Sequence, residues 1–411
     1  MEPQGSLLRV LKNRNFLALW IGQIISQFGD RLAQMALIGL YLKQTAGISL
    51  SHSVPVMRNL FFFSTLPILL FSPLAGVYVD RWSRKKTLIA ADLLRAGLIL
   101  LIPLLAGYTD GMWSIYGVIF LVFTVTCFFS PAKSAIIPNL VKKRELLAAN
   151  SLSNITRLIA MIGGVTAGGI IVAWTGTKMS FYLDSLSFLL SGVAILAIRI
   201  KEDPPPEESK VGIGRVAKEL VAGLNFIRKK KRVKFVATSL FILMGASGIG
   251  YLLVTVFVTK ALNLGTIGLS VLATFLGIGM LAGSLIYGHF GEQIEREKVI
   301  VGGTLVCGVC AVLLGGSKSL FLLSLGVSII GFIASPIMIA AYTLTQELTP
   351  DRIRGRVFSA LEVIINSSFL FFIWVAGVLG AWLPIQSIFY LTGVGLLVYG
   401  SKTLVLRYTK E

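Results

Sequence analysis

Long apolar runs separated by short polar breaks make up most of the chain. A helix that crosses a membrane needs about 20 mainly apolar residues, and twelve runs of roughly this length or longer follow one another. The predicted spans are residues 15–41, 54–79, 87–107, 112–136, 146–174, 180–200, 234–259, 266–289, 299–316, 319–346, 355–382 and 384–406. Glycine, proline and charged residues mark the breaks. The pattern predicts an all-α membrane protein with twelve transmembrane helices.

The longest polar segment, residues 201–233, lies between the sixth and seventh predicted spans. It opens with K-E-D-P-P-P-E-E-S-K, which is too polar and proline-rich to pack and therefore predicts a linker. Apolar residues then recur at helical spacing on one face, at Ile213, Val216, Ala217, Leu220, Val221, Leu224 and Ile227. We expect an amphipathic helix that lies on the cytoplasmic leaflet with its bases on anionic lipid. A calmodulin-like protein or a nucleic acid is the alternative partner, and we predict no nucleic acid.

A charged stretch after the second span, G-V-Y-V-D-R-W-S-R-K-K at 76–86, has a weaker copy in the second half of the chain. A charge at mid-bilayer costs about 2.5–3.5 kcal/mol on insertion scales, so this stretch must lie in water between two helices. The copy, G-H-F-G-E-Q-I-E-R-E-K at 288–298, follows the eighth span, and in both a glycine precedes an acid by four residues. The repetition predicts a duplicated protein. The predicted domains are a six-helix bundle at 1–200, a cytoplasmic linker at 201–233 and a second six-helix bundle at 234–411.

Composition and charge agree with a membrane protein. Only 14% of the residues are charged, whereas soluble domains carry about 25%. With the N-terminus in the cytoplasm, 29 of the 38 Lys and Arg residues fall in the tails and loops of that side, as the positive-inside rule requires. We expect a multi-pass protein of the plasma (inner) membrane with both termini cytoplasmic, whose first span directs insertion without a cleaved signal.

The charged stretch carries a family resemblance. Its pattern, G-x-x-x-D-R-x-x-R-K-K, resembles the signature loop of the major facilitator superfamily. The residues at the motif positions are Gly76, Asp80, Arg81, Arg84 and Lys85. The resemblance implies two pseudo-symmetric six-helix bundles that rock around a central cavity. It also implies that the loop locks the outward-open state by pairing with neighbouring helix ends.

Three further stretches resemble one branch of that superfamily. They are S-Q-F-G-D-R at 26–31, S-P-A-K-S-A-I-I-P-N-L at 130–140 with A-N-S at 149–151, and R-G-R-V at 354–357. The branch holds macrolide-efflux proteins, enterobactin-type siderophore exporters and lysophospholipid transporters. Relatives often place an acid on the fourth helix as partner of the loop arginine. This chain has Lys133 there instead, and Asp92 is the candidate substitute.

Polar residues inside the first span are the strongest candidates for chemistry. Gln23, Gln27, Asp30 and Gln34 are spaced at i, i+4, i+7 and i+11, with Arg31 beside them. Amide and carboxylate groups that face lipid without partners are unfavourable, so this face is predicted to point inward. Two interpretations of Asp30 stay open. It is a protonation or cation site, or it is one half of a structural ion pair with Arg31 or Lys133.

Glu362 in the eleventh span is the second candidate, with Asn366 one turn further on the same face. A second internal repeat, 139–151 and 347–359, is offset by 208 residues. It aligns Glu362 with Asn154 in the fifth span, near Arg157. Relatives use these two helices in gating, so a contact there could open and close. Structural pairing is the equal alternative.

Other charged and aromatic residues are less specific signals. Asp92 and Arg95 are three apart on one helix and are predicted to pair locally. Asp184 is interpreted as interfacial. Lys133 either faces the cavity or snorkels to the interface. In the cavity it would repel cationic drugs or bind an acidic head group or siderophore. Phenylalanine clusters either line an apolar pocket or meet lipid: Phe61–Phe63, Phe128, Phe129, Phe369, Phe371 and Phe372.

Motifs of soluble catalysis are missing from the sequence. It holds no G-x-x-x-x-G-K-[ST] phosphate loop, no G-x-S-x-G motif and no cluster with metal-ligand spacing. His52 and His289 are the only histidines. The three cysteines, Cys127, Cys307 and Cys310, fall inside apolar runs and are interpreted as packing residues. We therefore predict no cofactor, no metal and no enzymatic activity.

Together these features predict a secondary active transporter. We expect proton-coupled export of lipophilic or amphiphilic small molecules, such as macrolide-like drugs, by alternating access. The alternatives are a lysophospholipid transporter or flippase, whose head group and tail would suit the mixed basic and apolar first and fourth spans, and a siderophore exporter. A receptor or scaffold without transport has no support beyond the segment at 201–233. We expect a monomer surrounded by membrane lipids, with protons as the coupling ion.

Overall fold

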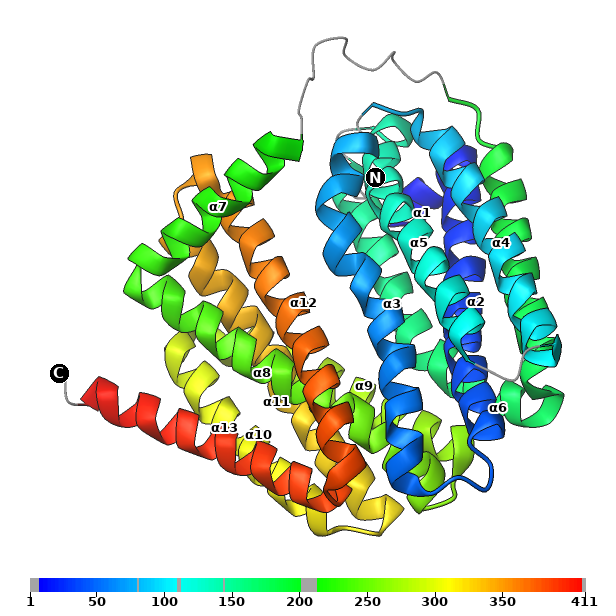
Figure 1. Cartoon of the computed structure of the whole chain (residues 1–411). Helices are drawn as coiled ribbons and strands as arrows, with labels where there is room; N and C mark the ends of the chain where they lie inside the picture. Colours follow the sequence, from blue (N-terminus) through cyan, green and yellow to red (C-terminus); the bar gives the residue numbers. More distant parts are fainter. Residues whose placement is uncertain (1–6, 80, 109–111, 143–144, 201–212, 409–411) are drawn as a thin grey trace. The chain divides into compact units, whose positions relative to one another are not determined.

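Helices make up the described fold. The structure is a computed structural model that describes residues 7–79, 81–108, 112–142, 145–200 and 213–408, and these ranges contain no strand. The first half of the chain (Figure 1) holds α1 (Leu7–Leu11), α2 (Arg14–Gln44), α3 (Leu50–Val79), α4 (Arg84–Tyr108), α5 (Trp113–Leu140) and α6 (Leu146–Leu196). The second half holds α7 (Ile213–Lys229), α8 (Lys231–Val256), α9 (Gly265–Phe290), α10 (Arg296–Gly316), α11 (Leu320–Leu348), α12 (Asp351–Trp382) and α13 (Ile385–Tyr408).

Ten helices among the described residues are long and apolar enough to cross a membrane. One of the ten, within α6, runs from Ala148 to Leu196 and is long enough for two spans. α2 is not among the ten, although it has 31 residues, and polar side chains interrupt its apolar sequence. The prediction of an all-α membrane protein is confirmed, while the count of twelve spans stays a prediction.

A break at Gly176 divides α6. Its backbone has φ 81° and ψ 167°, a conformation that glycine adopts readily and other residues rarely do. The helical segments on either side correspond to the predicted spans at 146–174 and 180–200. The sequence therefore located the turn correctly.

The chain forms two compact units. The first comprises Met1–Lys43 and Phe63–Ile213, and the second comprises Gln44–Phe62 and Gly214–Glu411. In the first unit, buried side chains of α2, α4, α5 and α6 share one hydrophobic core, and in the second a separate core joins α7, α8, α10, α11, α12 and α13. Burial of apolar side chains thus stabilises each unit from within.

The start of α3 belongs to the second unit because it is held there by side-chain contacts. Lys260, in a π-helical turn at Phe257–Ala261, donates to the backbone carbonyl of Ile48 at 3.1 Å. Further along α3, the aliphatic part of Arg58 packs against Gly377 of α12, where a Cβ would overlap it. The predicted boundary at residue 234 took no account of this segment, and the predicted domain limits stay a prediction.

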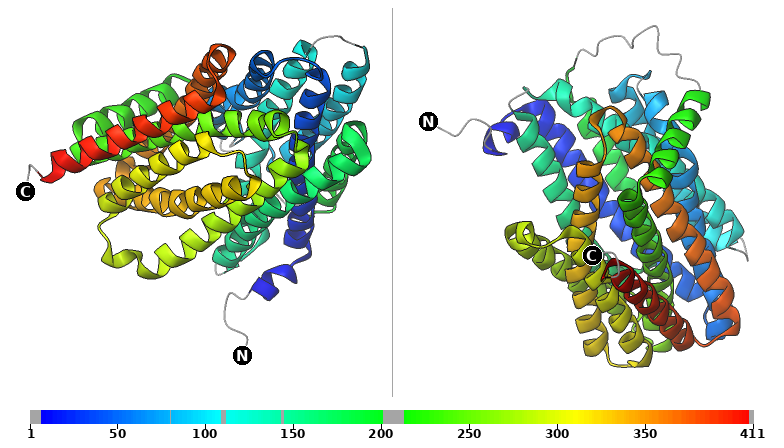
Figure 2. Two further views of the ribbon diagram at one scale, coloured as in Figure 1. Left: turned by 90° about the horizontal axis from the view of Figure 1, so that it is seen from below. Right: turned by 90° about the vertical axis from the view of Figure 1, so that its left-hand side faces the viewer.

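Small residues set the spacing of helices inside the second unit. α10 and α13 lie side by side, as do α8 and α12 (Figure 2). A Cβ at Gly308 of α10 would stand 3.0 Å from the carbonyl oxygen of Gly393 in α13. Glycine lets two helices approach this closely in a membrane, where packing rather than hydrophobic exclusion drives association.

The predicted amphipathic helix is present as α7, but its apolar side packs on protein. Ile227 is buried in the core of the second unit, and Leu220 and Leu224 pack against that core. A Cβ at Gly223 would overlap the carbonyl of Arg356 in α12. The expectation that this face lies on a lipid leaflet is therefore wrong for these residues, because α12 covers them. The linker sequence at 201–212 lies outside the described residues.

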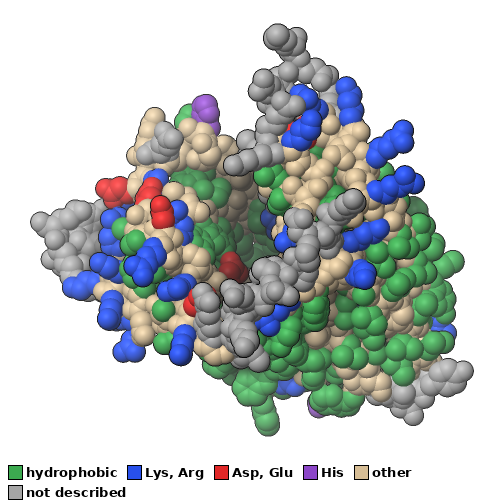
Figure 3. Space-filling view, turned by 90° about the horizontal axis from the view of Figure 1, so that it is seen from above, with side chains coloured by type: hydrophobic (Ala, Val, Ile, Leu, Met, Phe, Trp, Pro, Cys, Tyr) green, Lys and Arg blue, Asp and Glu red, His purple; other side chains and the backbone are tan. Residues whose placement is uncertain are grey.

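Basic side chains gather on α7 and at the start of α8, within the second unit. Figure 3 shows many Lys and Arg side chains on the face that it views. On α7 and the start of α8 the exposed bases include Lys218, Arg228, Lys229, Lys230 and Lys231. These residues belong to the segments that the charge count assigns to the cytoplasm.

Candidate functional site

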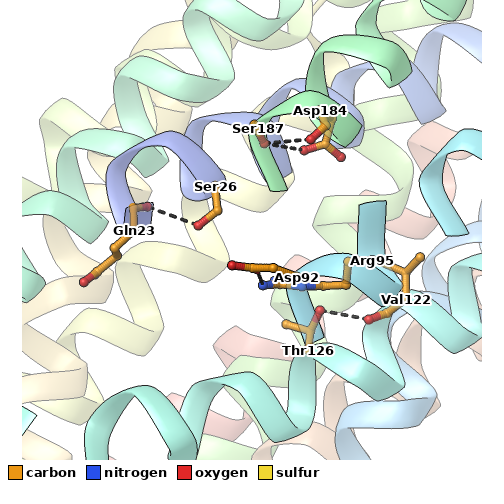
Figure 4. A network of polar contacts seen from close by, with 8 residues as sticks. All are labelled: Gln23, Ser26, Asp92, Arg95, Val122, Thr126, Asp184 and Ser187. Carbon is orange, nitrogen blue, oxygen red and sulfur yellow. Dashed lines mark hydrogen bonds and ion pairs between the residues drawn. The ribbon is translucent and has the colours of Figure 1, made fainter. Parts of the chain in front are cut away.

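The polar face of α2 points into the first unit. Gln23 is buried and donates from Nε2 to the carbonyl oxygen of Ser153 in α6 at 3.4 Å. Ser26 is also buried, and its hydroxyl donates to the Gln23 carbonyl (Figure 4). Gln27 and Asp30 further along α2 are half-buried. The inward orientation predicted from the spacing is confirmed for Gln23.

A buried ion pair lies on α4, next to this face. Arg95 is 1% exposed and pairs with Asp92, which is fully buried three residues earlier (Figure 4). The guanidinium carbon of Arg95 lies 4.2 Å from the ring centroids of both Phe129 in α5 and Phe188 in α6. A cation between two ring faces is attracted by both quadrupoles. The predicted local pair is confirmed, and its charge is balanced by one carboxylate and two rings.

Asp30 is surrounded by bases from three helices. Arg31 of α2, Arg95 of α4 and Lys133 of α5 all interact with its carboxylate electrostatically. Arg31 also donates from Nη1 to Oε1 of Gln34 at 3.0 Å. Space for the Arg31 stem comes from α6, because a Cβ at Gly164 would lie 3.0 Å from Arg31 Cβ. The structure thus brings Asp30, Arg31, Gln34 and Lys133 into one neighbourhood.

Lys133 lies half-buried on α5. Its ammonium interacts electrostatically with Arg157 of α6, with Asp30 and with Arg95. Lys133 is therefore repelled by two positive charges, Arg157 and Arg95, and attracted by one negative charge, Asp30. An anionic group that bound there would relieve the excess of positive charge.

Asp184 on α6 is a buried acid that the sequence interpretation placed wrongly at the interface. It is 1% exposed, and a Cβ at Gly29 of α2 would overlap its Oδ1 and the Ser187 hydroxyl. The Ser187 hydroxyl donates to the Asp184 backbone carbonyl at 2.7 Å (Figure 4). A signal existed in the sequence. The residues Ser180, Asp184, Ser187 and Ser191 repeat the i, i+4, i+7, i+11 spacing of the first span, and all four are buried.

Two bases of the signature loop hold helix ends within the first unit. Arg84 donates from Nη1 to the Ala135 carbonyl at 3.1 Å and to Asn139 Oδ1 at 2.8 Å, at the end of α5. Lys85 donates from Nζ to the carbonyls of Leu196 at 2.9 Å and Ile198 at 2.7 Å, at the end of α6. Carbonyls at a helix C-terminus lack intrahelical donors and carry partial negative charge, so a cation stabilises them.

Gly76 and Arg81 are the other described positions of the signature loop. Gly76 is half-buried near the end of α3, and the Arg81 backbone N–H donates to the Tyr78 carbonyl at 3.0 Å. Asp80 lies outside the described residues. Asp92 was predicted as substitute partner of the loop arginine, and the structure gives it Arg95 as ion-pair partner.

Glu362 of α12 lies in the second unit and is exposed. The Tyr342 hydroxyl of α11 donates to its Oε1 at 2.7 Å, and the Tyr342 ring stacks on Phe358 with centroids 5.7 Å apart. Asn366 donates from Nδ2 to the Glu362 backbone carbonyl at 2.8 Å. Asn366 therefore contacts the Glu362 backbone, and Tyr342, which the sequence did not single out, contacts the carboxylate. The side chain of Asn154 lies outside the described residues.

The phenylalanine clusters separate into different environments. Phe61 is buried, and its ring stacks on Tyr251 of α8 at 4.3 Å. Phe129 packs on Arg95, whereas Phe371 is 55% exposed. In the second unit the Tyr251 ring also lies 6.2 Å from the ring of Phe369, so it contacts members of two of the predicted clusters.

Metal-ligating groups are scattered. Among the described residues, no three His, Cys, Asp or Glu side chains converge as metal ligands would. Cys127, Cys307 and Cys310 are buried free thiols. What the site can do is electrostatic: three acids and several bases inside a membrane unit can bind ions and exchange protons.

Known proteins resemble this chain along almost its whole length. The model of the family described as transmembrane secretion effector matches residues 6–410. Macrolide efflux protein A of Streptococcus pyogenes is 26% identical over 363 residues, which cover 85% of each chain. Multidrug efflux pump Tap of Mycolicibacterium fortuitum is 25% identical over 421 residues, covering 99% of this chain and 97% of that protein.

Solved structures agree in fold. A POT family transporter in complex with a thioalcohol-conjugated peptide superposes with a TM-score of 0.72 at 14% identity, over 96% of each chain. A bacterial homologue of the iron transporter ferroportin gives a TM-score of 0.65 at 15% identity, over 96% of this chain and 98% of that one. The chain therefore belongs to the transmembrane secretion effector family of the major facilitator superfamily and is a multi-pass membrane transporter, not an enzyme.

Proposed function

We propose that this transporter exports lipophilic or amphiphilic small molecules in exchange for protons. The observation that carries the proposal is the setting of Asp30, a half-buried carboxylate on a membrane helix among Arg31, Arg95 and Lys133. Ionisable residues inside membrane helices cost free energy, are rare, and mark ion or substrate pathways and proton relays. Protonation of Asp30 would favour one arrangement of the transporter and substrate the other, which is alternating access.

The energy available suits export of a neutral compound. One proton that moves down a potential of 100 mV releases about 2.3 kcal/mol. Since about 1.4 kcal/mol corresponds to a factor of ten, that energy supports a roughly fifty-fold gradient. Glu362 is the second candidate proton site. Its carboxylate is exposed and accepts a hydrogen bond from Tyr342, so it is accessible to ions in its own unit.

We further propose twelve spans in two six-helix bundles, joined by the segment at 201–233. The break at Gly176 supports two spans within α6, and the length of α2 supports a further span. The exposed bases on α7 support a cytoplasmic position for that helix and for both termini, in the plasma (inner) membrane. A monomer in contact with membrane lipids is the simplest assembly.

The substrate class rests on relatives and on charge. Macrolide efflux protein A and multidrug efflux pump Tap carry names that indicate export of drugs. The excess of positive charge around Lys133 would suit an anionic head group. For that reason a lysophospholipid transporter is the second candidate function, and a siderophore exporter is the third.

The test is transport by the purified chain in proteoliposomes with an imposed pH gradient. We expect a macrolide loaded inside to leave faster when the gradient is applied, and Asp30→Asn to lose this acceleration. Counterflow of labelled substrate without a gradient should remain in Asp30→Asn. Glu295→Gln is the matched control, because its carboxylate is 62% exposed and pairs with Lys298 on the same helix end.

The outcomes separate the candidates. Gradient-driven flux that persists in an Asp30→Asn, Glu362→Gln double variant would contradict the proton-site assignment. Flux of a lysophospholipid that depends on acyl-chain length and not on pH would favour the second function. Absence of transport for macrolides, lysophospholipids and siderophores in the wild-type chain would remove all three.

A further inference from the structure

Asp184 is a buried acid that has no part in the proposed function. Its side chain lies inside the first unit, where the second half of α6 packs against α2 and α4. Ser187 Oγ lies 3.3 Å from Asp184 Oδ1 and donates to it or to the carbonyl of the same residue. Asp184 Oδ2 is buried and has no hydrogen-bond partner among the described residues.

Arg95 is the base that acts on Asp184, and it already has its own counterion, Asp92. Arg95 acts on Asp184 electrostatically, but its guanidinium pairs with Asp92 and is enclosed between the rings of Phe129 and Phe188. Among the described residues, no Lys or Arg nitrogen forms an ion pair with Asp184. An ionised carboxylate in this position would be both desolvated and unpaired, which is strongly unfavourable.

Another acid, Asp30, has a larger electrostatic effect on Asp184 than Arg95 has. Asp30 follows Gly29 on α2, and the missing Cβ of Gly29 lets the Asp184 carboxyl lie against the α2 backbone there. The two carboxyls interact electrostatically. Among the described residues, the other charged groups on the two packed helices include Arg31 on α2 and the Asp92–Arg95 ion pair on α4. Two interacting carboxyls in a desolvated site do not both ionise readily, so they titrate as a pair.

From this geometry we propose that Asp184 is a proton-binding site coupled to Asp30, and that the two carboxyls together carry one proton at neutral pH. The proton resides on Asp184, which has no base of its own, while Asp30 is ionised beside Arg31 and Lys133. When Asp30 gains a proton from the aqueous side, repulsion at Asp184 falls and Asp184 can release its own. Only O–H bonds form and break. This inference rests on the proposed proton coupling for its role in transport.

The first test detects the proton directly and does not depend on transport. Infrared spectra of the full chain in nanodiscs at neutral pH should contain a protonated-carboxyl C=O band that Asp184→Asn removes. Asp92→Asn, the matched control on the neighbouring helix, should leave that band and remove carboxylate bands instead. Loss of carboxylate bands in Asp184→Asn, with the C=O band unchanged, would overturn the proposal.

Thermal stability gives a second readout. An amide resembles a neutral carboxyl in size and polarity, so Asp184→Asn should melt within about 2 °C of the wild type, whereas Asp92→Asn should lose more than about 5 °C. A variant Asp184→Asn that fails to fold, or that is destabilised as much as Asp92→Asn, would show that the ionised form is the native one.

Flux then tests the coupling. Asp184→Asn should lose pH-driven export while it keeps counterflow, and Glu295→Gln should keep both. Undiminished pH-driven export by Asp184→Asn would overturn the coupling to Asp30. Failure of the proposed function is distinguishable, because it would show as pH-independent flux in the wild type while the infrared band of Asp184 persisted.

Discussion

Removal of the Asp92 carboxylate tests whether an ion pair holds Arg95 inside the first unit. In Asp92→Ala the guanidinium, which is 1% exposed, would lose its ion-pair partner and keep the faces of Phe129 and Phe188. Removal of one partner from a buried ion pair costs about 3–5 kcal/mol, because the other charge is left uncompensated. In a unit of this size, ~1 kcal/mol shifts Tm by about 2–4 °C. We therefore expect Asp92→Ala to lower Tm by about 6–20 °C.

A double-mutant cycle isolates the pair. Arg95→Met alone leaves Asp92 buried without its cation and should be destabilising too. The double variant Asp92→Ala, Arg95→Met removes both charges, and an apolar replacement of a buried ion pair is often neutral or stabilising. We expect the double variant to regain most of the lost stability. The assay is size-exclusion chromatography of fluorescently tagged protein after heating in one detergent, with the Tm of each variant compared.

Additive losses of Tm in the double variant would refute the reasoning. If the loss of Tm in the double variant equals the sum of the two single losses, the residues are not coupled. The ion pair would then make no net contribution, and the burial of Arg95 would depend on its aromatic neighbours alone. Phe188→Leu serves as the separate test of that contribution, and its expected cost is about 2 kcal/mol or more, from cation–π attraction and packing together.

Two further predictions concern stability. Lys85→Met removes a cation from the carbonyls at the end of α6, and we expect a loss of about 1.5–3 kcal/mol, measured as a lower Tm that Lys85→Arg largely restores; equal losses for both variants would refute the capping role. Gly248→Ala should destabilise α8 by about 1–3 kcal/mol, because a Cβ would lie 2.7 Å from the carbonyl oxygen of Phe369, whereas Gly250→Ala, which meets nothing within 4 Å, should be tolerated. Similar Tm values for these two alanine variants would contradict the close approach of α8 and α12.

The membrane helices could be predicted from the chain alone. Residues 87–107 and 266–289 were predicted as spans, and α4 and α9 begin and end within three residues of those limits. The break between the fifth and sixth predicted spans coincides with the positive φ of Gly176. Such features depend on the transfer free energy of a continuous segment and on a local backbone conformation, so neighbours in sequence are sufficient to reveal them.

Local side-chain relations were equally accessible. The spacing of Gln23 and Asp30 placed both on one inward face, and the three-residue separation of Asp92 and Arg95 predicted their pair. α-Helical periodicity fixes which residues share a face. The same periodicity in Ser180 and Asp184 was present but was not used, and Asp184 was placed at the interface from its position along the span.

Long-range partners were decided only by tertiary structure. Lys85 caps carbonyls that lie 111 and 113 residues further along the chain, and Phe129 and Phe188 reach Arg95 from two other helices. The apolar side of α7, expected on lipid, is covered by α12. In a bilayer, lipid and protein are equally apolar surroundings for such a face. Hydrophobicity alone therefore cannot choose between them.

The sequence by itself determined that this chain spans a membrane repeatedly, which residues each helix turns to one face, and which short motif joins two of its helices. It did so because hydrophobic length and helical period are properties of single segments. Tertiary structure decided which acid has a base. Glycine at position 29 lets Asp184 lie against α2, while Arg95, a cation that acts on it, is already paired on α4. Whether a buried charge is compensated depends on the neighbours that pack against it, so the sequence of one helix does not reveal it.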